Sequence, residues 1–363
     1  MPQADSPDLA PGERVRSLVP MLADSDVRVR KSAVIALGRI GCPESVEMLC
    51  GALGDEDEGV RVLVCQALGR LADPACVPAL LEHAHDPSRE VRSGVLWVFA
   101  NIAAHGGEAG GAAPEAVRSA LFTPVVVLAF DPDDGVRADA AAVLGSLRDP
   151  RAADPLLVLV EDACPRVRAN ACASLGLLDD QAGLEALLSC AEDEEEDALV
   201  AVSALDGLAR RAERGSLAAG NACAGRALCA ACRRAAACPA EVPAAASMPS
   251  ADSASVAPAP PGAADAPTQA DVRATALWAL GMLPIPGEGE RSQVREVLAA
   301  ALADGDVWSR RYAVEALVRI GGEDARAVLQ EARERHRAGE CALEPEVVEM
   351  IDRALQVAEA PLP

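Results

Sequence analysis

The chain has 363 residues, of which 33 are basic and 56 acidic, so its formal net charge is −23. Such an acidic surface repels phosphate polyanions, and we therefore expect no nucleic-acid partner. Aromatic residues make up only 2% of the chain against 51% apolar residues overall. Alanine, leucine and valine must therefore fill the core, which favours closely packed helices over a β-sandwich.

The N-terminus has neither the basic nor the apolar region of a secretory signal, and no stretch approaches the roughly 20 apolar residues of a membrane span. We therefore expect a cytoplasmic protein without a membrane partner, whose 12 cysteines are reduced. Residues 1–23 are predicted to hold a capping helix. Its apolar face is expected at Val15, Leu18, Val19 and Leu22.

A motif of about 31 residues then recurs along the chain, and such fixed periods indicate a repeat protein. Its mark is an aspartate six residues before an arginine, usually with valine directly before the arginine and Leu-Gly seven and eight residues after it. The aspartate and arginine positions are Asp24 and Arg30, Asp55 and Arg61, Asp86 and Arg92, Asp131 and Arg137, Asp162 and Arg168, and Asp304 and Arg310. A related copy has Val272 and Arg273.

Each copy predicts two helices. In the second copy Val60, Val64 and Leu68 have the spacing of one apolar helix face around Arg61. The aspartate six residues before the arginine is expected to cap this first helix or to lie in its first turn. A second helix with its own apolar face follows. Residues 24–213 are thus predicted to hold repeats 1–6, with a glycine-rich insertion at 105–114 and a degenerate sixth repeat that has Ala198 at the arginine position.

Residues 214–270 interrupt the repeats. This stretch is rich in alanine and cysteine at first and then in proline, and its last leucines are Leu217 and Leu228. Such a segment buries too little apolar surface to offset the entropy of ordering, so we predict a partly disordered linker. Residues 271–340 are predicted to hold repeats 7 and 8. Residues 341–363 are predicted to form a capping helix and tail, with an apolar face at Val347, Met350, Ile351 and Leu355.

The Asp-x5-Arg motif, followed by Ala-Leu-Gly and a second helix that contains proline, resembles the HEAT-like repeats of the phycobilisome-lyase (PBS-lyase) type. The resemblance covers residues from about 17 to 213 and from 271 to about 337. It implies an all-α fold, an α-solenoid (armadillo/HEAT-like superhelix) of about eight two-helix repeats. It also implies that the arginines and aspartates of the motif form a ladder of ion pairs that fixes the register of neighbouring repeats. Some members of this family handle bilin chromophores, so a phycobilin-lyase-like enzyme is one alternative function.

Four cysteines give a second alternative. Cys223, Cys229, Cys232 and Cys238 are close enough in sequence to hold zinc or an iron–sulfur centre in a metal or redox module. Cysteine also takes core positions in the repeats, where other copies have valine or leucine, so packing is the favoured interpretation and we expect no cofactor. With only four histidines in the chain, no catalytic arrangement of Ser/His/Asp or Cys/His residues can be assembled, and we expect no catalytic residue.

The predicted second helices carry acidic residues beside their core positions. We expect these carboxylates to follow one side of the solenoid, the concave one, and to bind a basic or amphipathic segment of another protein. A merely solubilising face is the alternative interpretation. The favoured function is therefore that of a non-catalytic scaffold or adaptor. The candidate partner-binding residues are Glu47, Glu82, Asp154 and Glu185.

Overall fold

The computed structural model describes residues 10–107, 113–193, 196–215, 269–282, 288–304 and 306–357, and within these ranges it contains helices and turns but no strand. The described helices fall into two compact units, of which one ends at Leu159 and the other begins at Val160. The fold is therefore the α-solenoid of two-helix repeats that the sequence predicts.

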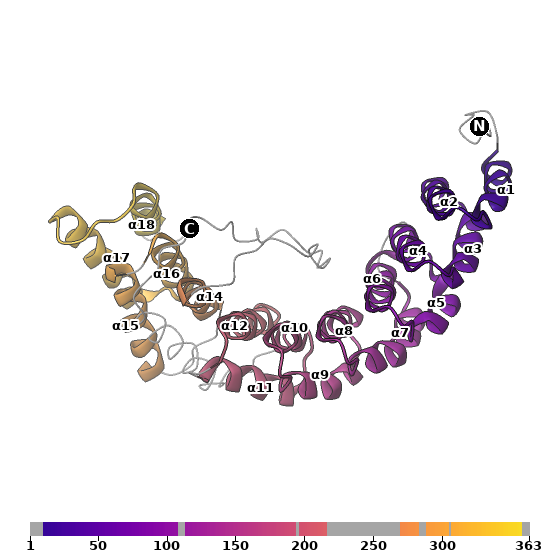
Figure 1. Ribbon diagram of the computed structural model, residues 1–363. Helices are drawn as coiled ribbons and strands as arrows, with labels where there is room; N and C mark the ends of the chain where they lie inside the picture. The colour runs from indigo at the N-terminus through magenta and orange to yellow at the C-terminus, as the bar shows by residue number, and fades with distance from the viewer. Residues whose placement is uncertain are drawn as a thin grey trace. The chain divides into compact units, whose positions relative to one another are not determined.

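The N-terminal unit consists of two rows of helices (Figure 1). The first row is formed by α2 (Val27–Ile40), α4 (Glu58–Leu71), α6 (Arg89–His105) and α8 (Asp134–Leu147), each packed against the next. The second row is formed by α3 (Pro43–Gly51), α5 (Val77–His83), α7 (Glu115–Leu128) and α9 (Ala153–Leu159). Helix α1 (Pro11–Leu22) packs against α2 at the start of this unit. Short 3₁₀ turns at Ala52–Gly54, Pro74–Cys76 and Pro150–Ala152 adjoin three of the second-row helices.

The C-terminal unit has the same construction. Its first row is formed by α10 (Pro165–Leu175), α12 (Ala198–Glu213), α14 (Gln269–Met282), α16 (Val307–Ile320) and α18 (Pro345–Val357). Its second row contains α11 (Gln181–Glu192), α15 (Glu288–Asp304) and α17 (Gly322–Arg337). Helices α12 and α14 pack directly against each other although residues 214–268 separate them in sequence. The first row therefore continues across the interruption of the repeats.

Small apolar side chains and glycines allow the first-row helices to approach closely. Leu37 and Leu68 are completely buried, as is Cys65 at a core position of the second repeat. A Cβ atom placed on Gly38 would lie 2.9 Å from the Ala67 Cβ on the next first-row helix. Real Cβ contacts are longer than this, so the glycine of the Leu-Gly motif is required by helix packing.

The first-row helices are not capped by the predicted aspartates. The N-caps lie two residues further along, where the Asp57 carboxylate accepts the Val60 N–H at 3.0 Å and the Ser88 hydroxyl oxygen accepts the Val91 N–H at 3.3 Å. The predicted aspartates Asp55 and Asp86 instead accept the backbone N–H two residues later, both at 2.8 Å. The N-cap prediction is therefore wrong, because these carboxylates face the preceding repeat.

The terminal helices bury part of the apolar faces predicted for them. Val15 and Leu18 of α1 are buried, whereas Val19 is 42% exposed. Val347 and Ile351 of α18 are buried. The four clustered cysteines at 223, 229, 232 and 238 lie outside the described residues, as does most of the predicted linker.

Candidate interaction surface

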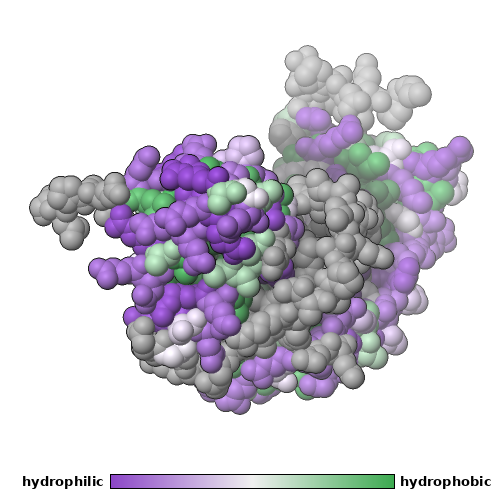
Figure 2. All heavy atoms as spheres, turned by 90° about the vertical axis from the view of Figure 1, so that its left-hand side faces the viewer, coloured by the Kyte–Doolittle hydropathy of each residue, from purple (hydrophilic) through white to green (hydrophobic). Residues whose placement is uncertain are grey.

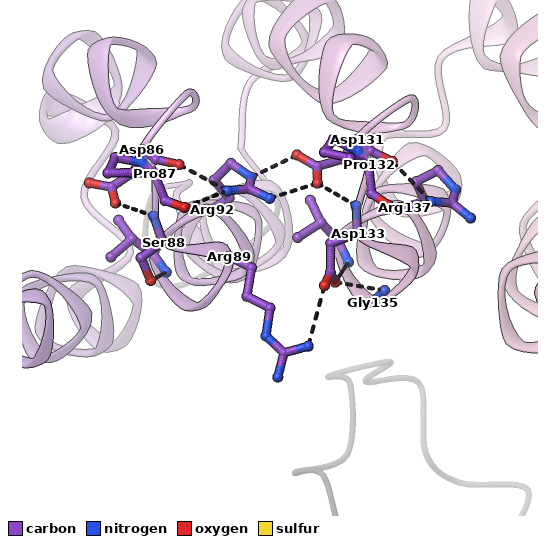
Figure 3. Close-up of polar contacts among 12 residues, drawn as sticks. Asp86, Pro87, Ser88, Arg89, Arg92, Asp131, Pro132, Asp133, Gly135 and Arg137 are labelled. Carbon is purple, nitrogen blue, oxygen red and sulfur yellow. Dashed lines mark hydrogen bonds and ion pairs between the residues drawn. The ribbon is translucent and has the colours of Figure 1, made fainter.

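Arginine–aspartate ion pairs join neighbouring first-row helices in the N-terminal unit, and Figure 3 shows those of Arg92 with Asp131 and of Arg89 with Asp133. Arg30 donates from Nε and Nη2 to the two carboxylate oxygens of Asp55, at 2.8 and 3.0 Å. The same two bonds join Arg61 to Asp86 at 2.8 and 2.9 Å, and Arg92 to Asp131 at 2.7 and 2.8 Å. Each arginine thus holds the aspartate of the next repeat through a bidentate, charge-assisted pair.

The same guanidinium groups bind the loop that precedes their own helix. Arg92 donates from Nη1 to the carbonyl oxygens of Asp86 and Pro87, at 2.9 and 3.2 Å. The equivalent bond to the aspartate carbonyl is 3.0 Å in Arg30, 2.9 Å in Arg61, 3.0 Å in Arg137 and 2.8 Å in Arg168. One side chain therefore fixes both a loop and the neighbouring repeat. Its role is structural, and it is not part of a free binding surface.

Two arginines pair with glutamates that the sequence pattern does not mark. Arg168 donates to the Glu196 carboxylate, 3.1 Å from Nε, and Arg310 donates to Glu344 at 2.7 Å. Glu196 lies two residues before α12 and Glu344 one residue before α18, and this position was the signal that could have identified them. Asp304 is the last residue of α15, and its side chain lies outside the described residues.

The predicted partner-binding carboxylates lie on second-row helices and are exposed. Glu47 belongs to α3, Glu82 to α5 and Asp154 to α9 of the N-terminal unit, and Glu185 belongs to α11 of the C-terminal unit. Within the N-terminal unit, Figure 1 shows the second row on the outer side of the curve and the first row on the inner side. The expectation that these carboxylates lie on the concave side is therefore wrong for this unit, because the helices with the arginine ladder occupy that side.

Large apolar side chains are also exposed on the second-row helices of the N-terminal unit, which we call the outer row. Val127 of α7 is 48% exposed, Phe130 in the turn after α7 is 54% exposed, Val158 of α9 is 57% exposed, and Leu81 of α5 is 39% exposed. Glu82, Val127 and Val158 occupy equivalent positions, each about one helical turn before the ladder aspartate of the following repeat. The outer row thus combines carboxylates with apolar side chains.

The family model for HEAT repeats matches residues 15–100, 123–209 and 263–341, which together make up more than half of the chain. The chain belongs to the HEAT-repeat family. None of the curated proteins matches it in sequence. The arginines of the ladder all lie within the matched ranges, so the ladder belongs to the repeat itself.

Solved structures share this HEAT-repeat fold at low sequence identity. An engineered protein has a TM-score of 0.51 at 18% identity, with 94% of this chain and 87% of that chain covered. Kap95p, in a structure that concerns its binding to RanGDP, has a TM-score of 0.63 at 14% identity, with 98% of this chain and 49% of that chain covered. Kap95 in the Kap95:Nup1 complex has a TM-score of 0.62 at 13% identity, with coverages of 95% and 46%. The present chain therefore spans about half the length of these Kap95 chains.

The described cysteines of this HEAT chain are free, and several belong to the core. Burial raises the pKa of the Cys65 thiol to about 12 and that of Cys76 to about 12 as well, so both remain neutral at physiological pH. A neutral buried thiol is a poor nucleophile. Among the residues that the structure describes, His, Cys, Asp and Glu side chains form no group of three or more that could hold a metal ion. Within the same residues, no helix has the length and apolar character to cross a membrane.

Proposed function

We propose that this protein is a non-catalytic HEAT-repeat scaffold or adaptor that binds another protein through its acidic outer row. The observation that carries the proposal is that exposed carboxylates on α3, α5 and α9 share this row with exposed apolar side chains on α5, α7 and α9. The Kap95 structures support a protein partner in general terms, because both are described with a bound protein.

A basic amphipathic segment has the chemistry that fits this row. Its apolar side chains would cover Val127 and Val158, which removes exposed apolar area from water at about 25 cal/mol per Å². Its lysines or arginines would lie beside Glu82 and Asp154, whose exposed carboxylates form no ion pair with another residue that the structure describes. Exposed ion pairs add little affinity, so the charges mainly set orientation and association rate, and the apolar contacts supply most of the binding energy.

A fluorescein-labelled helical peptide with leucines on one face and lysines on the other tests this proposal by fluorescence anisotropy with the full chain. The triple variant Glu47→Lys, Glu82→Lys, Asp154→Lys is expected to bind about tenfold more weakly at low salt, because three attractive contacts become repulsive. Added salt is expected to reduce this difference, since it screens exposed charges.

The matched control is the triple variant Glu331→Lys, Glu334→Lys, Glu346→Lys, which makes the same change of net charge on exposed positions of the C-terminal unit. It is expected to keep close to the wild-type affinity. Equal weakening in both triple variants would show a non-specific charge effect and would refute a site on the outer row. Charge reversal at Glu185 of α11 separately tests whether this carboxylate of the C-terminal unit contributes to binding.

The resemblance to PBS-lyase repeats keeps a chromophore-handling enzyme as an alternative. The motif of these repeats forms the solenoid, and residues that determine a fold do not by themselves carry a chemical activity. A difference spectrum of the protein with a bilin tests this alternative, and analysis of zinc and iron in the reduced protein tests a metal site at Cys223, Cys229, Cys232 and Cys238. A cytoplasmic location remains part of the proposal and is tested by fractionation of the cells that make the protein.

A further inference from the structure

An apolar groove of about 690 Å³ lies in the C-terminal unit. It is formed by the second half of α16, the beginning of α17 and the last turns of α18. Figure 2 faces these helices and shows small hydrophobic patches on a largely hydrophilic surface. A volume of this size lies within the roughly 300–1,000 Å³ of known ligand sites. The groove is lined by the apolar side chains of Val314, Leu317, Val318, Leu329, Met350 and Leu355.

The sequence of α16 explains why the groove is open. Leu317-Val318-Arg319-Ile320 stands where the first repeat has Leu37-Gly38-Arg39-Ile40, so valine replaces the glycine of the Leu-Gly motif. Glycine at this position permits close packing of the next first-row helix, as at Gly281, where an added Cβ would lie 2.8 Å from the Ala316 Cα. Accordingly, α16 and α18 pack less closely than α14 and α16.

Val318 is also exposed at the groove instead of covered by a neighbouring helix. Its exposed fraction is 52%, which is high for a valine in the middle of a packed helix row. Contiguous apolar surface of this kind marks an interaction site in a soluble protein. The groove therefore has the character of a docking surface, since none of the described residues of the C-terminal unit covers its apolar wall.

The rim of the groove differs in charge from the rest of this acidic chain. Three arginines, Arg319, Arg326 and Arg353, line it together with two glutamates, Glu315 and Glu323, so the lining is positive by one charge. Arg353 is exposed and also pairs with Glu349 of its own helix, at 2.9 Å. Helix α17 begins at the groove with Gly321 at its N-cap, and its first turn already carries Glu323 and Asp324, so the preference for an anion rests on the arginines. A lining that is positive by one charge, in a chain of net charge −23, favours a carboxylate.

We infer that this groove binds an apolar helical segment of a partner protein that carries carboxylates. Leucine-type side chains would occupy the floor around Val318, and the carboxylates would lie near Arg319 and Arg353. This is the helix-in-groove mode, which uses apolar anchors at i, i+3, i+4 and i+7. A second copy of the chain is a poorer occupant, because two chains of net charge −23 repel each other. The inference rests on the proposed protein-binding function, but it assigns a second site with the opposite charge preference.

The test uses a fluorescein-labelled helical peptide with leucines on one face and glutamates on the other, titrated with the full chain. Val318→Asp places a carboxylate on the floor of the groove and is expected to weaken binding at least about tenfold, as loss of a central apolar anchor does. The control Val19→Asp changes a similarly exposed valine of α1 and is expected to leave the affinity unchanged. Circular dichroism and thermal melting establish that both variants are folded.

Charge preference gives a second readout. The double variant Arg319→Glu, Arg353→Glu is expected to weaken binding of the glutamate-faced peptide. Equal affinity of this peptide for wild type and Val318→Asp would overturn the inference, as would no binding at about 1 mM. Self-association of the wild-type chain that Val318→Asp abolishes, measured by sedimentation, would identify a second copy as the occupant and overturn it as well. Failure of the outer-row proposal can be distinguished from failure of this inference, because the outer row is tested with a different peptide, the lysine-faced one, and with the triple variant at Glu47, Glu82 and Asp154.

Discussion

Removal of one ladder arginine is expected to destabilise the N-terminal unit strongly. The Arg61 side chain is 12% exposed and its partner Asp86 is 5% exposed. Arg61→Ala deletes two bonds to this carboxylate, at 2.8 and 2.9 Å, and one bond to the Asp55 carbonyl at 2.9 Å. It also leaves the Asp86 charge buried without its cation. Breaking a buried pair from one side costs about 3–5 kcal/mol, so we expect a loss of this size in the free energy of unfolding.

The same reasoning predicts that removal of both charges is much less harmful. Arg61→Met with Asp86→Asn leaves no uncompensated charge, and the asparagine oxygen can still accept the Ser88 N–H that Asp86 accepts at 2.8 Å. Replacement of a whole buried pair is often close to neutral, so the double variant is expected to be more stable than Arg61→Ala. Arg70→Ala, at an exposed position of the same helix, is the control and is expected to change stability by no more than about 0.5 kcal/mol.

Urea denaturation followed by tryptophan fluorescence measures this effect in the unit that contains it. Trp97 belongs to α6 of the N-terminal unit, and replacement of Trp278 and Trp308 by phenylalanine leaves it as the single reporter. A local reporter is needed because repeat arrays do not always unfold in one step. The reasoning is refuted if Arg61→Ala unfolds at the same urea concentration as Arg70→Ala, or if the double variant is less stable than Arg61→Ala.

Three further predictions concern packing, pH and thiol chemistry. Gly281→Ala should destabilise the protein by about 1–3 kcal/mol, because the new Cβ meets Ala316, whereas Gly289→Ala, with open space around it, should be neutral or stabilising in urea denaturation. The hydrogen bond and charge of Arg151 lower the pKa of Asp149 below 3.8. The ionised Asp149 carboxylate therefore stabilises the folded state fully above pH 3.8, and this stabilisation is lost as the pH falls through the lowered pKa. The difference in unfolding free energy between wild type and Asp149→Asn should therefore shrink below pH 3.8. Cys65, whose pKa is raised to about 12 by burial, should resist labelling by a thiol reagent at pH 8 until urea unfolds the protein, and rapid labelling of the native chain, detected by mass spectrometry of the peptide, would contradict its place in the core.

The repeat architecture could be predicted from the sequence because the same residues recur at a fixed spacing. Valine before Arg61 and leucine after it define one helix face, and Gly38 and Gly281 meet a neighbouring helix in the structure. The position of the N-caps could not be predicted in the same way. Asp55 and Asp57 are both suitable caps, and only the three-dimensional position of Arg30 shows that Asp55 faces the preceding repeat.

Neither the side of the curve on which each helix row lies nor the C-terminal groove could be predicted from the sequence, and both required coordinates. Sequence spacing assigns Glu47 and Glu82 to second helices but does not determine on which side of a curved stack those helices lie. The substitution of Val318 for the motif glycine was a visible signal of looser packing. Its consequence depends on how α18 packs, and this is a long-range property that periodicity does not contain.

Hydrogen–deuterium exchange of the full chain, with and without the lysine-faced peptide, tests the central claim most directly. Binding to the outer row predicts slower amide exchange in α5, α7 and α9, the helices that carry Glu82, Val127 and Val158. Exchange in the inner helices α4, α6 and α8 should change less. Protection confined to those inner helices, with α5, α7 and α9 unchanged, would contradict the assignment of the binding surface.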